Sequence, residues 1–226
     1  IIIILGAIIV ERIICLLLGY ALGNFQTAYI IGRIHHIDIR EYGSHNSGTT
    51  NALRVMGRKT GLIVLVVDIL KCGIAIGLTR LLFGSTHGDI IYVLMMYAVT
   101  GTILGHNFPV VMGFKGGKGV ACTAGMVFFY HPYMIPAEVV IFFAVFFTTH
   151  YVSLSSLLAY AGMLIQIIIL GQNGFLGALS AAQLGEIYGL TIFLTVMAYW
   201  KHRENIQRLL SHTEWKTYLS KKNRAE

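Results

Sequence analysis

Residues 61–83 read GLIVLVVDILKCGIAIGLTRLLF, and this stretch decides the fold class. A helix that crosses a bilayer needs ~20 mostly apolar residues, and this run is long and apolar enough. Similar runs recur along the whole chain, and they cover residues 1–32, 61–83, 90–112, 117–131, 133–149, 155–170 and 176–199. The sequence therefore predicts an all-α, polytopic integral membrane protein with seven transmembrane helices, forming one domain over residues 1–226.

The composition indicates the same class. Of the 226 residues, 56% are hydrophobic and 12% are charged, and the mean hydropathy is +0.71. Soluble domains carry roughly 25% charged residues, and a soluble protein of this length could not bury so much apolar surface. The three cysteines, Cys15, Cys72 and Cys122, lie in or beside apolar runs, which favours packing over a disulfide framework. We therefore expect lipid to cover much of the molecule.

Positive charge distinguishes the two sides of the predicted bundle. Lysines and arginines gather in residues 33–59, in residues 113–119 and in the tail, residues 200–226. The alternate connections contain no Lys or Arg; these are residues 84–89, 131–133 and 171–175. Because cationic connections stay in the cytoplasm, we predict the N-terminus outside and the C-terminus inside. The net charge of +7 then reflects orientation, so we expect the lipid bilayer as a partner, no nucleic acid and no obligate protein partner.

The first cytoplasmic connection contains the run GSHNSGTTNALR, residues 43–54. Its glycines free the backbone to turn and its short polar side chains add donors, a composition typical of an anion-binding nest. Thr49 or Thr50 is expected to cap a helix whose start, beside an arginine, would bind phosphate. The alternative is a flexible polar turn. The candidate residues of this run are Ser44, Asn46, Thr50, Asn51 and Arg54.

The second cytoplasmic connection, residues 113–119, reads GFKGGKG directly before an apolar run. Lys118 among three glycines predicts a phosphate cradle at a helix start. A Walker A loop is excluded, because Met112 stands where its first Gly is required and Gly119 where its Ser or Thr is required. The alternative is a short basic turn. The candidate residues here are Lys118, Gly116, Gly117 and Gly119.

Two further pairs of polar residues flank predicted spans on the same side. Ser155 and Ser156 either cap the sixth span or contact a ligand. His202 and Asn205 lie three residues apart, so they share a helix face. They either belong to a site or are solvated at the membrane surface.

Ionisable residues inside the predicted spans need a partner, because burying a lone charge in lipid is costly. Asp68 and Lys71, three residues apart, are interpreted as a structural ion pair rather than as catalytic groups. Glu186 has no evident partner in the sequence.

Together, these groups predict a site at the cytoplasmic interface for one or two phosphate-bearing molecules. Group transfer there would depend on positioning and electrostatic stabilisation. We expect no metal and no other cofactor, since no cluster of metal-ligating side chains is apparent. The alternative is a membrane transporter of phosphate or small organic anions. Transporters bind near the midplane, often between inverted repeats, whereas here the polar connections share one surface and no repeat is visible.

Three long motifs resemble those of the bacterial acyl-phosphate:glycerol-3-phosphate acyltransferases, the PlsY family. Residues 43–57, GSHNSGTTNALRVMG, are similar to that family's GSxNxGATNxxRxxG. Residues 105–121, GHNFPVVMGFKGGKGVA, are similar to its second motif nearly throughout. Residues 201–209, KHRENIQRL, are similar to its third, RHxxNIxRL. The resemblance covers about residues 13–210.

The resemblance implies a reaction and a location. A long-chain acyl group would pass from acyl phosphate to the sn-1 hydroxyl of glycerol 3-phosphate, giving lysophosphatidic acid and inorganic phosphate in phospholipid biosynthesis. The protein would be a multi-pass protein of the bacterial cytoplasmic membrane whose active site faces the cytoplasm. No cofactor and no covalent enzyme intermediate are implied.

The resemblance also implies residue roles. Ser44, Arg54 and Lys118 would contact the acyl phosphate and the transition state. The glycerol 3-phosphate side would comprise Thr50, Ser155, Ser156, His202 and Asn205. Backbone would approach phosphate at Gly116, Gly117 and Gly119. Glu204 would be structural.

The chain departs from the family pattern at four places. Thr49 replaces the usual Ala, and Gly23 to Gln26 reads GNFQ instead of GSIP, which removes a proline kink. His150 and Lys201 each stand where Arg is usual. Lysine keeps the charge but loses the bidentate geometry of arginine.

Overall fold

The computed structural model describes residues 2–218, with side chains from residue 9 onward. Within this range every regular element is a helix, as predicted. The elements are α1 (Ile2–Gly23), α2 (Thr27–Ile34), η1 (Ile39–Glu41), α3 (Thr49–Phe83), η2 (Gly88–Ile90), α4 (Ile91–Asn107), η3 (Val110–Met112), α5 (Val120–Phe129), α6 (Met134–Thr149), α7 (Val152–Gln172), α8 (Ala181–Lys201) and α9 (Arg203–Leu210).

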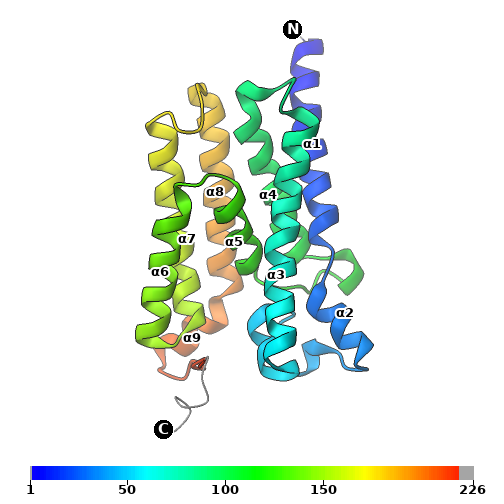
Figure 1. Cartoon of the computed structure of the whole chain (residues 1–226), viewed down its shortest axis with the longest axis vertical. Helices are drawn as coiled ribbons and strands as arrows, with labels where there is room; N and C mark the ends of the chain where they lie inside the picture. Colours follow the sequence, from blue (N-terminus) through cyan, green and yellow to red (C-terminus); the bar gives the residue numbers. More distant parts are fainter. Residues whose placement is uncertain (1, 219–226) are drawn as a thin grey trace.

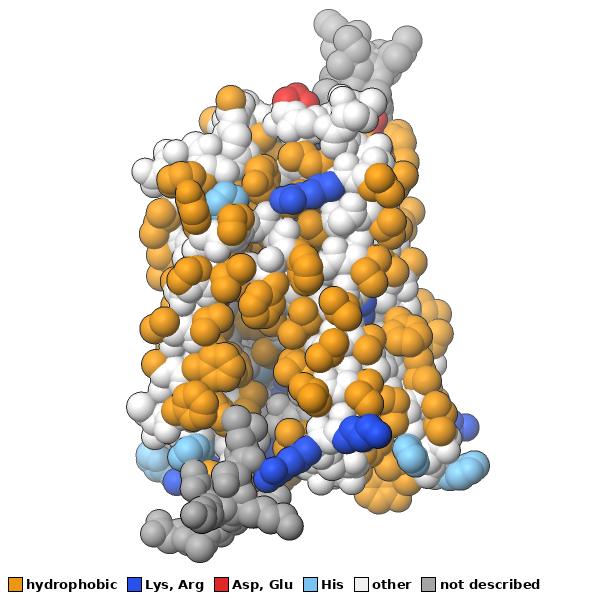
Figure 2. All heavy atoms as spheres, in the orientation of Figure 1, with side chains coloured by type: hydrophobic (Ala, Val, Ile, Leu, Met, Phe, Trp, Pro, Cys, Tyr) orange, Lys and Arg blue, Asp and Glu red, His pale blue; other side chains and the backbone are white. Residues whose placement is uncertain are grey.

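The long helices run along the long axis of the molecule (Figure 1). Helices α1, α3 and α4 form one group and α6, α7 and α8 another, with the short helix α5 between them. Helix α1 packs chiefly on α4, α3 on α5, and α6 on α7. Apolar side chains cover most of the face seen in Figure 2, while basic and histidine side chains line its lower rim.

Small residues allow α1 and α4 to approach closely. A Cβ atom added to Gly19 would collide with the backbone carbonyl of Ala98, and one added to Gly101 would collide with that of Leu16. Glycines at such crossings are typical of packing between membrane helices. This contact fixes the end of α4, from which the lysine-bearing loop departs.

Five helical stretches are long and apolar enough to cross a membrane, and they are Ile9–Ile34, Thr49–Phe83, Gly88–Met112, Val152–Gln172 and Ala181–Lys201. Helices α5 and α6 are apolar but shorter. The 10 residues of α5 extend ~15 Å at 1.5 Å per residue, about half of a ~30 Å hydrocarbon core. The run predicted at 117–131 is therefore helical only in its middle, because its first residues belong to the glycine loop.

The first predicted run is broken rather than continuous. Helix α1 ends at Gly23 and α2 begins at Thr27. The side-chain amide of Gln26 donates to the carbonyl oxygens of Gly23, Gly105 and His106 at 3.0, 3.4 and 3.2 Å. The expectation that losing the family's proline removes a kink is therefore wrong, since Gln26 holds the break through hydrogen bonds.

The predicted connection at 33–59 is partly helical. Helix α3 already begins at Thr49, and its only non-helical residue is Gly57, with φ 85° and ψ 175°. Glycine tolerates this backbone conformation without a steric penalty. The first turns of α3 therefore carry Asn51 and Arg54 as a separate short segment ahead of the long span.

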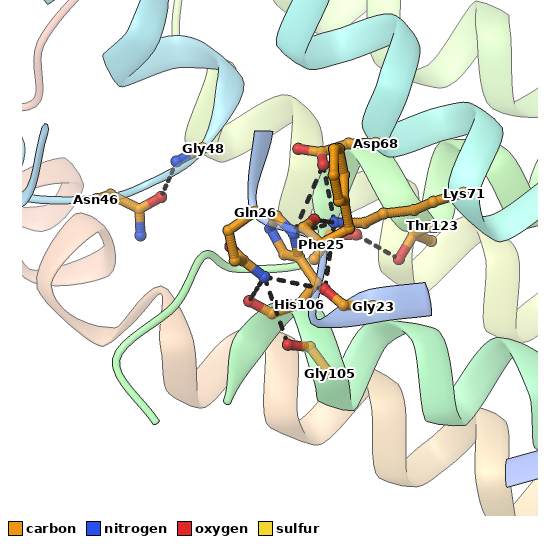
Figure 3. A network of polar contacts seen from close by, with 11 residues as sticks. Gly23, Phe25, Gln26, Asn46, Gly48, Asp68, Lys71, Gly105, His106 and Thr123 are labelled. Carbon is orange, nitrogen blue, oxygen red and sulfur yellow. Dashed lines mark hydrogen bonds and ion pairs between the residues drawn. The ribbon is translucent and has the colours of Figure 1, made fainter. Parts of the chain in front are cut away.

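The predicted ion pair between Asp68 and Lys71 is present, with 2.8 Å between Oδ1 and Nζ, and both side chains are buried. Lys71 Nζ also donates to the Phe25 carbonyl at 2.9 Å and contacts His106 Nδ1 at 2.9 Å (Figure 3). The pair thus joins α3 to the α1–α2 break and to the end of α4.

Glu186 has a partner that the sequence did not reveal. Its carboxylate pairs with Arg12 at 2.6 Å and accepts from the Tyr97 hydroxyl at 3.2 Å. These residues lie on α8, α1 and α4, so the pairing depends on how distant helices pack.

Candidate active site

A cavity of about 590 Å³ has its polar lining residues near the end of the bundle where α9 lies. It is bounded by the run before α3, the start of α5, the start of α7, the α8–α9 junction and the segment after α9. Most predicted site residues line it: Ser44, Asn46, Thr50, Asn51, Arg54, Lys118, Gly119, Ser156, His202 and Asn205. The remaining predicted residues, Gly116, Gly117, Ser155, Lys71 and Glu204, do not line it, whereas Asp68 does.

The N-terminus of α3 faces this cavity. Its N-cap is Gly48, and within the described range no side chain caps it, so the prediction that Thr49 or Thr50 is the cap is wrong. Gly48, Thr49 and Thr50 all line the cavity. An uncapped helix start has free N–H groups and a positive dipole end, which together favour an anion.

Asn51 organises the first loop more than it faces a ligand. Its Oδ1 accepts from Ser44 N at 2.8 Å, and its Nδ2 donates to the carbonyls of Ile39 and Tyr42 at 3.2 and 2.9 Å. The side chain is 1% exposed. Since its amide is fully used, Asn51 positions Ser44, and Asn46 similarly accepts from Gly48 N at 3.0 Å.

The glycines of the second loop are required for packing rather than for a ligand. A Cβ on Gly117 would collide with the His106 ring, and one on Gly116 with the His106 carbonyl. Gly117 N also donates to that carbonyl at 3.0 Å. Gly119, with φ 82°, does line the cavity and is the N-cap of α5. The loop is therefore pressed onto the end of α4, which orients Lys118.

Lys118 lies at the centre of the polar end of the cavity. Its Nζ donates to Asn205 Oδ1 from the α8–α9 junction. Burial, reinforced by the nearby Arg208, lowers the pKa of Lys118 to about 8. The ammonium is thus present at neutral pH in a poorly solvated place, where its attraction for an anion is strong.

His202 sits between α8 and α9 and is 3% exposed. Burial, with the neighbouring Lys118, lowers its pKa to about 4. Its Nδ1 lies 2.7 Å from the Ala198 carbonyl. A carbonyl only accepts, so Nδ1 carries the proton and Nε2 keeps a free lone pair. His202 can therefore accept a hydrogen bond from a hydroxyl.

The serines at the start of α7 do not cap it. Helix α7 begins at Val152, and the hydroxyls of Ser155 and Ser156 donate back to the carbonyls of Tyr151 and Val152 at 3.0 and 2.7 Å. Of the two alternatives left open for these serines, capping is therefore wrong. Ser153, which the sequence analysis did not single out, instead turns its hydroxyl toward the site.

Glu214 is the most prominent site residue that the sequence analysis missed. Its carboxylate accepts from Asn205 Nδ2 at 2.7 Å, Ser153 Oγ at 2.9 Å and Arg208 Nε at 2.7 Å. Burial alone would raise the pKa of Glu214, but these hydrogen bonds outweigh burial and hold it below its usual value. Its place four residues after the end of the short helix α9 was the one available signal.

The segment that carries Glu214 also covers the first loop's arginine. Arg54 donates to Thr217 Oγ1 at 3.0 Å, and its guanidinium lies 5.2 Å from the centre of the Trp215 ring. Thr217 N donates to the His150 carbonyl at 2.9 Å. His150 thus meets the site through its backbone. Lys201, which stands where Arg is usual in the family, does not line the cavity. Its Nζ donates to the Asn107 carbonyl at 3.2 Å.

Glu204 lies at the surface. Its side chain is 66% exposed and stands 3.8 Å from Arg203 in an ion pair. Such exposed pairs contribute little to stability, so Glu214 fits a structural role better than Glu204. Among the described residues, no group of three or more His, Cys, Asp or Glu could hold a metal ion.

Comparison with known proteins identifies the family. A sequence model described as glycerol-3-phosphate acyltransferase matches residues 13–212, almost the whole chain. The chain belongs to the glycerol-3-phosphate acyltransferase family. It is therefore an enzyme of the acyltransferase class, as the three motifs indicated.

Relatives and solved structures of this family agree. The chain is 36% identical over 210 residues to the glycerol-3-phosphate acyltransferase of Bacillus cytotoxicus, covering 92% of this chain and 96% of that protein. It is 34% identical to that of Mycoplasmopsis synoviae, covering 90% and 93%. The crystal structure of PlsY (YgiH), an integral membrane glycerol 3-phosphate acyltransferase, in its glycerol 3-phosphate form has a TM-score of 0.79 and 29% identity, covering 92% of this chain and 96% of PlsY. Its lysophosphatidic acid form has a TM-score of 0.76 and 28% identity, covering 92% and 95%. The predicted resemblance to the PlsY family is confirmed.

Proposed function

We propose that this family member transfers a fatty acyl group from an acyl phosphate to the sn-1 hydroxyl of glycerol 3-phosphate. The products are lysophosphatidic acid and inorganic phosphate. One observation carries the proposal: a cationic, hydrogen-bonding end and an apolar section belong to one continuous cavity. The apolar section is lined by Leu65, Ile69, Ala124, Val127, Phe128, Val139, Phe142, Phe143 and Phe146. An acyl phosphate has the same division into a charged head and an apolar tail.

The polar end offers positive charge for two phosphate groups. Lys118, Arg54 and Arg208 line it together with the uncapped start of α3. We assign the acyl phosphate head to Ser44, Arg54, Lys118 and the first turn of α3. We assign glycerol 3-phosphate to the side formed by Thr50, Ser156, His202 and Asn205, and add Ser153 and Arg208. Ser155 is removed from this set because, unlike Ser156, it does not line the cavity.

The chemistry follows from these positions. An acyl phosphate is a mixed anhydride with a good leaving group, so the site chiefly has to position the hydroxyl and stabilise negative charge. The free Nε2 of His202 accepts the hydrogen bond of the sn-1 hydroxyl. The hydroxyl oxygen bonds to the acyl carbon while its proton passes to Nε2, and the bond from the acyl carbon to the phosphate oxygen breaks. The proton then moves from Nε2 to the departing phosphate, which leaves His202 neutral again. Lys118 stabilises the charge that develops on the carbonyl oxygen and the phosphate.

We propose seven spans, with the N-terminus outside and the site on the cytoplasmic side of a bacterial cytoplasmic membrane. The five longer helical stretches are five of these spans, and the shorter helices α5 and α6, with their flanking residues, supply the other two. Supporting this, the cation-rich connections belong to the end of the bundle that carries the polar lining of the cavity, while the alternate connections lack Lys and Arg. No described feature favours the transporter alternative, and membership of an enzyme family argues against it.

Donor specificity is tested with purified protein in detergent or nanodiscs. Palmitoyl phosphate, palmitoyl-coenzyme A and palmitoyl-acyl carrier protein are each supplied with glycerol 3-phosphate, and lysophosphatidic acid is quantified. We expect product from palmitoyl phosphate alone, and carbon NMR of the product should show an sn-1 ester. Equal turnover of a thioester, or an sn-2 ester, would contradict the proposal.

A further inference from the structure

Glu138 brings a carboxyl group into the apolar section of the cavity. It lies on α6, lines the cavity and is 5% exposed. Its Oε1 accepts from the side-chain amide of Gln166 on α7. A Cβ on Gly162 of α7 would lie 2.9 Å from the same oxygen, so the carboxyl is held firmly against that helix. The acyl transfer chemistry described above does not use this group.

Glu138 marks the inner end of the cavity along α6. The end of α6 nearest the polar site is its C-terminus, since the next residue, His150, is bonded to Thr217. From there the lining residues of α6 are Phe146, Phe143, Phe142, Val139 and finally Glu138. The residues of α6 before Glu138, Met134–Ala137, do not line the cavity. Phe146 and Glu138 are separated by about 12 Å along the helix, at 1.5 Å per residue.

The chemistry of the lining changes at this point. Each methylene group that leaves water for an apolar surface gains ~0.8 kcal/mol. A methylene group that reaches the Glu138–Gln166 pair gains no comparable free energy. The two polar groups remain hydrogen-bonded to each other and present polar rather than apolar surface to the chain. The benefit of lengthening an acyl chain should therefore stop at Glu138.

We propose that Glu138, held by Gln166, sets the acyl-chain length beyond which a further methylene group no longer increases kcat/KM. The inference rests on the proposed function, in that it assigns the apolar section to the acyl chain. A purely structural role for the pair, as a hydrogen bond between two membrane helices, predicts a stability change but no change in chain-length preference.

The test compares chain-length profiles of kcat/KM. Wild type, Glu138→Leu and Glu138→Gln are assayed with lauroyl, myristoyl, palmitoyl and stearoyl phosphates. Val140→Leu serves as the control, because Val140 is on the same helix, 65% exposed and outside the cavity lining. In wild type and in Glu138→Gln, kcat/KM should rise with length and then stop rising. In Glu138→Leu it should keep rising beyond that length, by up to about fourfold per added methylene, the equivalent of ~0.8 kcal/mol.

Two results would overturn the proposal. One is an identical profile in wild type and Glu138→Leu; the other is the same shift in Glu138→Gln as in Glu138→Leu, since glutamine remains polar. A profile altered by Val140→Leu to the same extent would also count against it, because the effect would then not belong to the cavity.

A measurement on wild type alone covers the case in which the leucine variant does not fold. At each chain length, kcat/KM is compared between an acyl phosphate with a terminal hydroxyl and one without it. The hydroxyl should lower kcat/KM at short chain lengths. The loss should be smallest at the length at which the chain end reaches Glu138, because the carboxyl can then form a hydrogen bond with the hydroxyl. An equal penalty at every length would contradict the proposal.

The same question can be asked without any donor. If wild type turns over no acyl phosphate of any length, the proposed donor is wrong. The role of Glu138 can still be tested, by measuring the binding of lysophosphatidic acids of increasing chain length. Affinity should level off in wild type and continue to increase in Glu138→Leu. Parallel affinity profiles would reject the role of Glu138 independently of the donor.

Discussion

Asn205 and Glu214 are joined by a 2.7 Å hydrogen bond from the amide nitrogen to the carboxylate. The amide oxygen of Asn205 faces the other way and accepts from Lys118. Because the carboxylate takes up the donor end of the amide, the acceptor end must point at the lysine. Glu214 therefore sets the orientation of Asn205, although it lies in a segment beyond the third motif.

Replacing Glu214 with glutamine should lower kcat/KM by about 10- to 100-fold, since hydrogen bonds to a charged group are worth about 1.5–3 kcal/mol. Glutamine keeps the size but cannot accept three donors as a carboxylate does. Steady-state kinetics on the folded variant measures the loss. Glu204→Gln, at an exposed position, is the control and should retain wild-type activity; equal effects of the two changes would refute the assignment.

Glu214 should also make stability depend on pH. Its pKa is lower in the folded protein than its ordinary value of 4.5, so the carboxylate stabilises the fold above pH 4.5 and this contribution disappears as the pH falls through the lower folded value. In thermal unfolding measured in detergent, Tm should fall more steeply with decreasing pH in wild type than in Glu214→Gln. Parallel curves would contradict this.

Lys118 should give the activity profile an alkaline limit. Its pKa is lowered to about 8 by burial, and the ammonium form is required to stabilise phosphate charge. In the free enzyme kcat/KM should therefore fall as the pH rises through about 8, and Lys118→Ala should abolish turnover while the protein remains folded. Rates that stay constant well above pH 8, or an active Lys118→Ala, would remove Lys118 from the reaction.

His202 should act as a neutral base. With its pKa lowered to about 4, no loss of activity attributable to this histidine is expected between pH 5 and pH 7, an interval set by the ordinary histidine pKa of ~6.5. His202→Ala should lower kcat by roughly 10²–10⁴-fold, the usual contribution of a positioned proton-accepting group. An acid limit near pH 6.5 that disappears in His202→Ala would mean that the imidazole titrates in the accessible range.

Asn205→Ala should raise the KM for glycerol 3-phosphate more than that for acyl phosphate, because the amide lies on the side assigned to glycerol 3-phosphate.

Asn51→Ala should act differently from Asn205→Ala. It removes three hydrogen bonds of the first loop, one buried and two partly buried, each worth on the order of 1 kcal/mol, so it should lower Tm as well as activity. Identical kinetic defects with unchanged Tm in both variants would contradict the separation.

Gly117→Ala should displace the lysine loop, since its new Cβ would collide with the ring of His106. We expect loss of activity with insertion into the membrane retained. Gly185→Ala, where a Cβ meets nothing within 4 Å, is the matched control and should be close to wild type. Normal activity in Gly117→Ala would show that the loop tolerates the shift.

The sequence was sufficient for the helical membrane class and for most of the cavity's polar lining. Long apolar runs report lipid contact directly, and the three motifs are long enough to identify the family and to bring Ser44, Lys118 and His202 into one site. The motif letters do not, however, say which way a side chain points. Asn51 and Gly117 belong to motifs yet support the backbone, because their neighbours in space come from Ile39 and His106.

What the sequence could not supply are contacts between distant segments. The Arg12–Glu186 pair joins α1 to α8, and Glu214 meets Ser153 from α7. Neither pair has a spacing that a local pattern could reveal. The end of the first run at Gly23 was likewise hidden, since the hydrogen bonds of Gln26 to α4 substitute for a proline.

The reaction itself is tested by following both products in one vessel. Purified protein is given palmitoyl phosphate and glycerol 3-phosphate, and inorganic phosphate and lysophosphatidic acid are measured over time. We predict that the two products appear in equal amounts, that neither forms without glycerol 3-phosphate, and that Arg54→Ala forms neither. Phosphate released without lysophosphatidic acid, or no release from the folded wild-type protein, would contradict the proposed transfer.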